Sequence, residues 1–257
     1  MKQLIRALQG LLLVVLASTA MATHAQTQVP LRVYGPGGPA PAMKEAAAAF
    51  EKKTGVKVDV TAGPTPQWLD KAKADADVIF SGSETMMTDF VLAMDGRITA
   101  GDVQPLYLRP LAILVRPGNP KKITGVRDLF APGLKVLVVN GAGQNGAWED
   151  MAGRKGDIQS VRSLRRNIVG YAKNSAEARQ TWTDKSEIDA WLIWNIWQVS
   201  NPTLAEVVPI EPEYAIYRDV GVVVTQLGKA GSTARQFTDF LSSPEGAAIF
   251  RKWGWIA

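Results

Sequence analysis

Three short segments carry residues that could bind a ligand, and each stands between a predicted strand and a predicted helix. They are Gly35-Pro36-Gly37-Gly38-Pro39, Ser81-Gly82-Ser83-Glu84 and Gly141-Ala142-Gly143-Gln144-Asn145-Gly146. Glycine lets backbone N–H groups approach a ligand closely, serine adds hydroxyl donors, and a helix N-terminus favours negative charge. The segments therefore predict a small-anion site made of Gly37, Gly38, Pro39, Ser81, Ser83, Glu84, Gly143, Gln144 and Asn145. Two structural alternatives stay open, a plain tight turn at the Gly-Pro segment and a helix N-cap at Ser83.

Aromatic and basic residues add further candidates. Gln67 and Trp68 precede a predicted helix, and three tryptophans recur every third residue at 191, 194 and 197, beside Asn195. That spacing predicts a helix whose tryptophans form a core stripe, with an aromatic cage for a cation as the alternative. Arg109 and Arg218 lie near two predicted chain crossings, where each could donate a bidentate hydrogen bond or brace a hinge. The expected binding set gains Gln67, Trp68, Trp194, Asn195 and Arg218.

The third glycine segment formally matches the dinucleotide fingerprint G-x-G-x-x-G. That fingerprint also needs a clean second strand ending in an acidic residue about 20 positions later. The stretch from Ile158 to Asn167 carries Arg162, Arg165 and Arg166 instead. We therefore predict no dinucleotide cofactor here. The segment still predicts an anion site, because glycine exposes backbone N–H groups at a helix N-terminus.

The residues needed for common catalytic chemistry are scarce. The chain contains no cysteine and one histidine, His24, which excludes thiol nucleophiles, thiolate zinc sites and disulfides. No G-x-S-x-G, S-x-x-K or H-E-x-x-H motif occurs. Glu149 and Asp150 point about 100° apart on a helix, so they do not converge on one glycosidic bond. The sequence predicts neither an enzyme nor a metal or cofactor site, with an exported hydrolase as the less favoured alternative.

Charge gives a weaker indication of the partner. Lysine and arginine number 29 against 24 aspartates and glutamates, a formal net charge of +5. This balance favours anionic partners without identifying one. The bases are interspersed with acids, as in Glu51-Lys52-Lys53, which is typical of solvated helix faces and predicts no nucleic-acid partner.

The N-terminus has the layout of an export signal. Lys2 and Arg6 precede an apolar run from Gly10 to Ala17, and small residues follow at Ala20, Ala22 and Ala25. The run is shorter than the roughly 20 residues that a membrane-spanning helix needs. We expect residues 1–25 to be cleaved and the mature protein to enter the periplasm without stable membrane insertion.

The remaining chain alternates short apolar strands with amphipathic helices, which predicts an α/β fold with doubly wound sheets. Strands are expected at 31–34, 56–60, 77–80, 107–116, 135–140 and 214–225, and helices at 40–53, 66–74, 233–241 and 244–252. A fresh α/β run begins near 135, and the last helices return to the first unit. This order predicts two lobes, residues 26–112 with 218–257 and residues 113–217, joined by a two-crossing hinge beside a cleft.

Four stretches of sequence resemble one known group. They are the run from Val33 to Pro39, the run from Lys71 to Glu84, Trp148-Glu149-Asp150-Met151 and Ser243-Pro244-Glu245-Gly246. Together they are similar to the accessory colonization factor AcfC group, which belongs to the type 2 periplasmic binding proteins related to molybdate and sulfate binders. The resemblance covers nearly all of the mature chain.

The resemblance implies a two-lobed cleft for a small oxyanion, carboxylate or phosphorylated acid, lined by the three glycine and serine segments. It also implies an ABC-type importer as partner, for transport or sensing, and it is compatible with a homodimer. The group's name adds an alternative role as an adhesin or host-interaction protein, which the sequence does not separate from solute capture.

Overall fold

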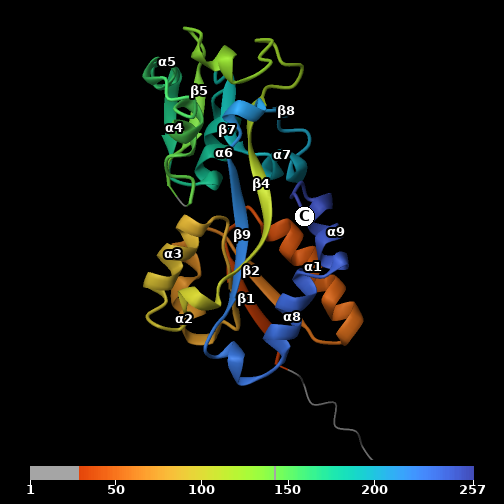
Figure 1. The fold of residues 1–257 in the computed structure, drawn as a ribbon. Helices are drawn as coiled ribbons and strands as arrows, with labels where there is room; N and C mark the ends of the chain where they lie inside the picture. The colour runs from red at the N-terminus through yellow and green to blue at the C-terminus, as the bar shows by residue number, and fades with distance from the viewer. Residues whose placement is uncertain (1–28, 142) are drawn as a thin grey trace, which may run out of the picture.

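The computed structural model describes residues 29–141 and 143–257. The predicted export signal and Ala142 lie outside the described residues. The chain forms two α/β lobes, stacked one above the other in Figure 1, with long strands running between them.

The first lobe, the lower one in Figure 1, is built on a twisted sheet in the order β2-β1-β3-β9-β4. Its strands are β1 (Leu31–Gly35), β2 (Val58–Ala62), β3 (Val78–Phe80), β9 (Tyr217–Val224) and the first half of β4 (Gln104–Val115). Its helices are α1 (Ala40–Thr54), α2 (Leu69–Asp75), α3 (Glu84–Ala93), α8 (Thr233–Leu241) and α9 (Pro244–Lys252). Strand β1 pairs in parallel with β2 and β3, whereas β9 runs antiparallel to β3.

The second lobe continues the same path of strands through β4-β7-β5-β6, with β8 also paired to β4. Its further strands are β5 (Val136–Val139), β6 (Ile168–Ala172), β7 (Ala190–Trp194) and β8 (Glu206–Val208), and its helices are α4 (Ala147–Ala152), α5 (Ile158–Asn167), α6 (Ser175–Asp184) and α7 (Ile196–Ser200). Short 3-10 helices lie at Thr65–Gln67, Ala100–Asp102, Val126–Phe130, Pro212–Tyr214 and Gly228–Ala230. Parallel strands with helical crossovers are the arrangement that the alternating pattern predicts.

Two strands connect the lobes. The first half of β4 pairs with β9, from Gln104↔Val222 to Pro110↔Tyr217, and its second half pairs with β7 from Leu111↔Trp194 onward. The change of partner inside one strand, together with the return of the chain along β9, produces the two crossings. The predicted lobe boundaries at 112–113 and 217–218 stay predictions, because the sheet passes continuously from one lobe to the other.

Most predicted elements form within a few residues of their expected bounds, and α8 and α9 have the expected bounds. The tryptophan segment is the clear correction. Trp191 and Trp194 lie in β7, all of whose residues are buried, and only Trp197 lies in the short helix α7. A fully buried strand has no polar alternation, so the third-residue spacing of the indoles could not reveal that the segment is extended.

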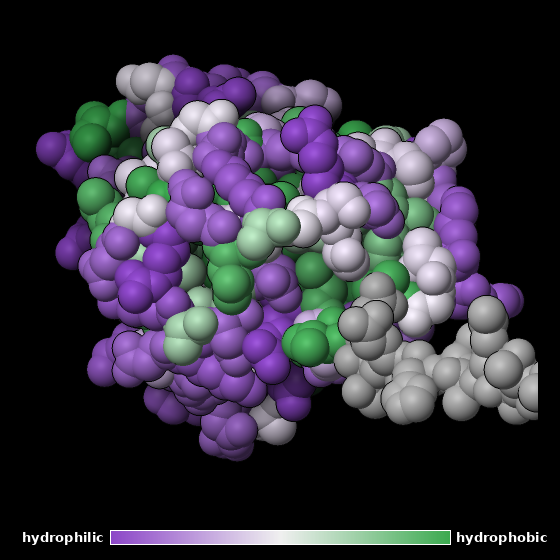
Figure 2. All heavy atoms as spheres, turned by 90° about the horizontal axis from the view of Figure 1, so that it is seen from below, coloured by the Kyte–Doolittle hydropathy of each residue, from purple (hydrophilic) through white to green (hydrophobic). Residues whose placement is uncertain are grey.

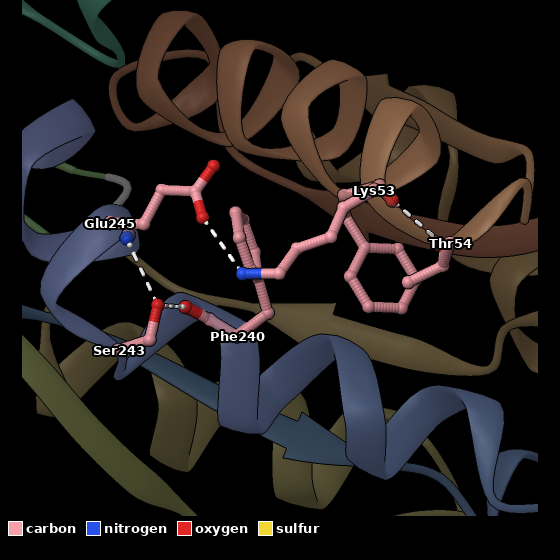
Figure 3. A network of polar contacts seen from close by, with 7 residues as sticks. Lys53, Thr54, Phe240, Ser243 and Glu245 are labelled. Atoms are coloured by element: carbon pink, nitrogen blue, oxygen red, sulfur yellow. Dashed lines mark hydrogen bonds and ion pairs between the residues drawn. The ribbon is translucent and has the colours of Figure 1, made fainter.

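The two C-terminal helices are fixed to α1, which places the end of the chain beside the hinge. Figure 3 shows the ammonium group of Lys53 bound to Glu245 at 3.0 Å and lying over the ring of Phe240. Ser243 caps α9, since its Oγ accepts from the N–H of Gly246 and donates to the carbonyl of Phe240. Phe50 of α1 packs against the ring of Phe237 at 5.3 Å. These contacts attach α8 and α9 to α1.

The outer surface of the first lobe is mostly hydrophilic, with smaller hydrophobic areas between, when the molecule is seen from below (Figure 2). Within residues 29–141 and 143–257, no helix combines the length and the apolar character that crossing a bilayer requires.

Candidate functional site

A pocket lies where the two lobes meet, and both lobes supply its walls. Its volume is about 110 Å³. The first lobe contributes Pro36, Gly37, Gly38, Pro39, Gly63, Pro64, Thr65, Gly82, Met86 and Arg109, and the second contributes Gln144, Asn174, Ser175, Ala176, Trp194 and Trp197. The strand ends of the first lobe and the ends of β6 and β7 in the second therefore converge, which is where α/β sheets bind ligands.

Arg109 is the charged centre of this pocket. It stands on β4 one residue before the crossing, and only 4% of its surface is exposed. Its Nη2 donates to the carbonyl of Gly82, and no carboxylate of the described residues lies within ion-pair distance of it. Burial lowers the pKa of the Arg109 guanidinium to about 9, with Asp219 opposing the shift, so the side chain stays charged at neutral pH. A buried cation without a counter-ion is costly unless an anion joins it.

Two indole rings flank the Arg109 guanidinium. The Cζ atom lies 4.9 Å from the ring of Trp194 and 5.0 Å from that of Trp255. Cation–π contacts of this kind stabilise the charge without using the N–H donors. The backbones of Gly38 and Gly82 complete the slot, because a Cβ atom at either glycine would come within 2.8 Å of a guanidinium nitrogen.

Buried donors without acceptors gather at this point. Arg109 Nε, Trp194 Nε1 and Trp197 Nε1 are buried and have no hydrogen-bond partner among the described residues. All three side chains line the pocket. Each such group costs free energy unless a partner is supplied. These unpartnered N–H donors therefore belong to residues that also line the pocket.

Helix starts and polar side chains surround these donors. Gly37, Gly38 and Pro39 lead into α1, whose dipole favours an anion at its first turn. Across the pocket, Asn174 caps α6 by accepting from the N–H of Glu177, and Gln144 donates to the hydroxyl of Ser175 at 2.7 Å. The walls between are apolar, formed by Pro36, Pro64, Met86 and the two indoles.

Five of the predicted binding residues line the pocket: Gly37, Gly38, Pro39, Gln144 and Trp194. The first and third glycine-rich segments thus meet there from opposite lobes. The others do not line it, for separate reasons given below. Their role in binding stays a prediction.

In the serine segment Gly82 lines the pocket, whereas the two serine hydroxyls bind inside the first lobe. Ser81 Oγ accepts from the N–H of Gly221, and Ser83 Oγ accepts from the N–H of Met86 at the start of α3. Both serines are fully buried, so Ser83 has the N-cap role left open above. Burial and the nearby charge of Asp219 raise the pKa of Glu84, which lies beside the hinge.

The remaining predicted residues lie in the core or at the rim. Trp68 is buried against Phe90 and donates to the carbonyl of Gly63, whereas Gln67 and Asn145 are exposed. Asn195 donates to the carbonyl of Gly254 at 2.7 Å. Arg218 forms an ion pair with Asp150 at 2.8 Å, so its guanidinium already has a partner.

Several pocket residues were absent from the predicted set: Thr65, Met86, Arg109, Asn174, Ser175 and Trp197. Arg109 had been placed near a crossing, but position alone did not separate it from Arg218. The ion pairs separate the two arginines, because Arg218 pairs with Asp150 whereas Arg109 has no carboxylate of the described residues within ion-pair distance. Asn174-Ser175 carried a readable signal, since an Asn followed by Glu three residues later marks a helix start.

Contact between the lobes depends on Gly143, which has a φ of +78°. A Cβ atom there would lie 2.7 Å from Ser83 Oγ and 3.0 Å from Met86 Cβ. Because Gly143 belongs to the second lobe and Ser83 to the first, the two lobes come into close contact at this glycine.

We expect Gly143→Ala to weaken ligand binding about tenfold or more, because the added methyl group pushes the lobes apart. Gly146→Ala is the matched control, since its φ is +74° and the nearest atom to an added Cβ lies at 3.9 Å. Both variants place alanine in the left-handed region, at a cost of roughly 1–2 kcal/mol. Calorimetric titration separates them, and equal loss of affinity in both would show that strain and not lobe contact matters.

Ser83→Ala is expected to lower the free energy of unfolding by about 0.5–2 kcal/mol, the range for a lost N-cap. Its effect on ligand affinity should stay within roughly threefold, because the hydroxyl is satisfied inside the first lobe. Urea denaturation and titration of the same preparations test both parts. Unchanged stability with strongly weakened binding would show that Ser83 binds the ligand and does not act as an N-cap.

Across the part of the chain that the structure describes, no three histidine, aspartate or glutamate side chains gather as a metal site would require. Near the hinge, Asp150 forms an ion pair with Arg218. The pocket itself offers donors rather than carboxylate ligands.

The fold and the site define a two-lobed solute-binding protein with a pocket between its lobes. A family model described as bacterial extracellular solute-binding protein matches residues 31–256, and the chain belongs to this family. Its fold is that of the type 2 periplasmic binding proteins.

The chain is also similar to solved and curated proteins. A structure of L-phospholactate-bound PEB3, a protein of Campylobacter jejuni, has a TM-score of 0.84 at 38% identity, covering 88% of this chain and 99% of that chain. Aconitate isomerase from a Pseudomonas species is 34% identical over 125 residues, 45% of each chain. A sulfate-binding protein from Synechococcus elongatus is 29% identical over 164 residues, 56% of this chain and 45% of that one. The matches span less than half the length of both curated relatives.

Proposed function

We propose that the protein captures a small organic anion between its lobes and releases it unchanged. The observation that carries the proposal is the set of three buried N–H donors without acceptors, on Arg109, Trp194 and Trp197. A carboxylate or phosphate group supplies acceptor oxygens and the negative charge that Arg109 lacks. Several such bonds, at about 1.5–3 kcal/mol each when charged, are enough for micromolar affinity near −8 kcal/mol.

The walls of the pocket favour an anion with a short carbon skeleton. Prolines, Met86 and indole rings would contact apolar atoms, which bare sulfate and molybdate do not have. The small volume limits the ligand to a few carbon atoms. PEB3, whose structure contains L-phospholactate, is consistent with this class of ligand. The proposed ligand of this chain is therefore a short phosphorylated or carboxylic acid.

The proposal includes the setting in which the protein works. An export signal, periplasmic delivery and docking to the membrane subunits of an ABC-type importer fit a family of extracellular solute-binding proteins. Sensing, and the host-interaction role suggested by the accessory colonization factor group, are alternatives to transport for the same anion-bound protein. A homodimer is compatible with each of them.

A ligand screen tests the proposal directly. The mature protein would be titrated in a calorimeter with L-phospholactate, 3-phosphoglycerate, citrate, cis-aconitate, sulfate and molybdate. We expect one-to-one binding of at least one organic acid, tighter than that of sulfate and molybdate, and recovery of that acid unchanged. Exclusive binding of an inorganic oxyanion would contradict the ligand class, and conversion of the acid at a catalytic rate would contradict simple capture.

A further inference from the structure

The last five residues of the chain lie between the lobes. Figure 1 shows the C-terminus between α9 of the first lobe and α7 of the second. Trp253 and Lys252 both bind Glu45 of α1, the indole Nε1 at 2.7 Å from Oε2, so the segment is attached to the first lobe. Gly254 then turns the chain with a φ of +87°.

The same segment contacts the second lobe. The carbonyl of Gly254 accepts from Asn195 Nδ2 at 2.7 Å, and Asn195 stands between β7 and α7. A Cβ atom at Gly254 would lie 3.0 Å from both Asn195 Nδ2 and Val199 Cγ2. The turn therefore packs closely on α7, which makes the C-terminal segment a third link between the lobes, beside β4 and β9.

Its final residues lie along the hinge strand at the pocket arginine. Ile256 and Leu108 form an antiparallel bridge with backbone hydrogen bonds of 2.7 and 3.2 Å. Leu108 directly precedes Arg109, and Trp255 directly precedes Ile256. Consequently, the ring of Trp255 lies 5.0 Å from the Arg109 guanidinium, which the ring of Trp194 also contacts.

Trp255 itself does not line the pocket. Its ring is buried, 3% exposed, and packs edge-on against Phe250 at 5.8 Å. It can affect a ligand only through Arg109, whose one hydrogen bond to the described residues goes to Gly82. An arginine with so few polar contacts depends on its flat neighbours for orientation.

We propose that Trp255 is a positioning residue, which the C-terminal segment 253–257 holds against Arg109 so that the guanidinium presents its free N–H groups to the pocket. The inference rests on the proposed function for its consequence in binding, but the orientation of Arg109 exists without a ligand. A movement of this segment would then change the orientation of Arg109 in the pocket.

Three variants test the proposal, with L-phospholactate, or the tightest organic acid of the screen, as probe. Trp255→Leu keeps bulk and removes the aromatic face, so we expect affinity to fall about tenfold, within the range of a desolvated cation–π contact. Trp255→Phe restores a ring and should bind within roughly threefold of the unsubstituted protein. Trp253→Leu is the control, because Trp253 belongs to the same segment but binds Glu45 and not Arg109.

A second readout needs no ligand. In nitrogen-15 NMR spectra of the free protein, the Nε–H signal of Arg109 should be sharp and slow to exchange in the unsubstituted protein and in Trp255→Phe, and broadened in Trp255→Leu. Unchanged Arg109 signals and unchanged affinity in Trp255→Leu would overturn the proposal, as would losses in Trp253→Leu equal to those in Trp255→Leu. If no anion binds the unsubstituted protein, the proposed function fails, and the Arg109 signal still decides the role of Trp255.

Discussion

Replacing Arg109 by glutamine is expected to weaken anion binding at least about a hundredfold. Hydrogen bonds to a charged group contribute about 1.5–3 kcal/mol each, and truncating one partner of a buried charge pair costs roughly 2–5 kcal/mol. Arg109→Lys should also bind poorly, because an ammonium group lacks the flat fork that contacts the rings of Trp194 and Trp255. Calorimetric titration measures both variants.

Arg109→Gln should leave the free energy of unfolding of the ligand-free protein unchanged, or raise it. Arg109 is buried without a carboxylate partner in the described structure, so its charge opposes folding until an anion binds. A site that costs stability when empty is typical of a functional pocket. A large fall in the melting temperature of free Arg109→Gln would instead identify Arg109 as a structural residue.

Arg116 is the matched control. Its guanidinium also lies over an indole, 3.6 Å from the ring of Trp182, but it donates to the carbonyls of Trp182, Lys185 and Ile188. Arg116→Gln should therefore lower stability by leaving those carbonyls without a donor, while anion affinity changes little. The two arginines, Arg109 in β4 and Arg116 directly after its end, thus separate binding from structure. If Arg116→Gln lost anion affinity and Arg109→Gln did not, Arg116 and not Arg109 would be the binding residue.

The second large effect is expected at Gly38. A Cβ atom there would lie 2.8 Å from Arg109 Nη1 and 3.8 Å from Trp197 Nε1. Gly38→Ala therefore places a methyl group among the donors that a ligand must reach, and we expect affinity to fall about tenfold to a hundredfold, by exclusion of the anion and displacement of the guanidinium. Titration with the same organic acid measures the loss.

Gly37 provides the neighbouring control. A Cβ atom at Gly37 meets nothing within 4 Å, and its φ is not in the left-handed region. Gly37→Ala should bind within roughly threefold of the unsubstituted protein, because it changes neither the donors nor the backbone of the loop. Equal losses in Gly37→Ala and Gly38→Ala would mean that the flexibility of the loop, and not space beside Arg109, controls binding.

The sequence predicted the fold class well because its signals are local. Alternating strands and helices, the left-handed Gly55 after α1 and the Ser-Pro start of α9 each act over a few residues. The β7 tryptophans were misassigned for the opposite reason. Their strand is buried on both faces by residues distant in sequence, which removes the alternation that would identify it.

The candidate site was only partly predictable. The glycine segments at 37–38 and 143–144 could be found because strand-to-helix loops converge at one edge of a sheet. Whether Ser81 faces the pocket or Gly221 depends on the pairing of β3 with β9 across 140 residues, which no local pattern encodes. Likewise, Arg218 forms an ion pair with Asp150 whereas Arg109 has no ion-pair partner among the described residues, a tertiary difference that no local pattern encodes.

The most direct test of the account follows the buried donors themselves. Nitrogen-15 NMR resolves the indole and arginine Nε–H signals, and Trp→Phe variants assign them among the 8 tryptophans of the chain. On titration with the tightest organic acid of the screen, the signals of Trp194 Nε1, Trp197 Nε1 and Arg109 Nε should move together and saturate at one equivalent, while that of Trp182, which already donates to Leu204, stays in place. Saturating binding that leaves the Arg109 and Trp197 signals unmoved would contradict the proposal that this pocket holds the anion.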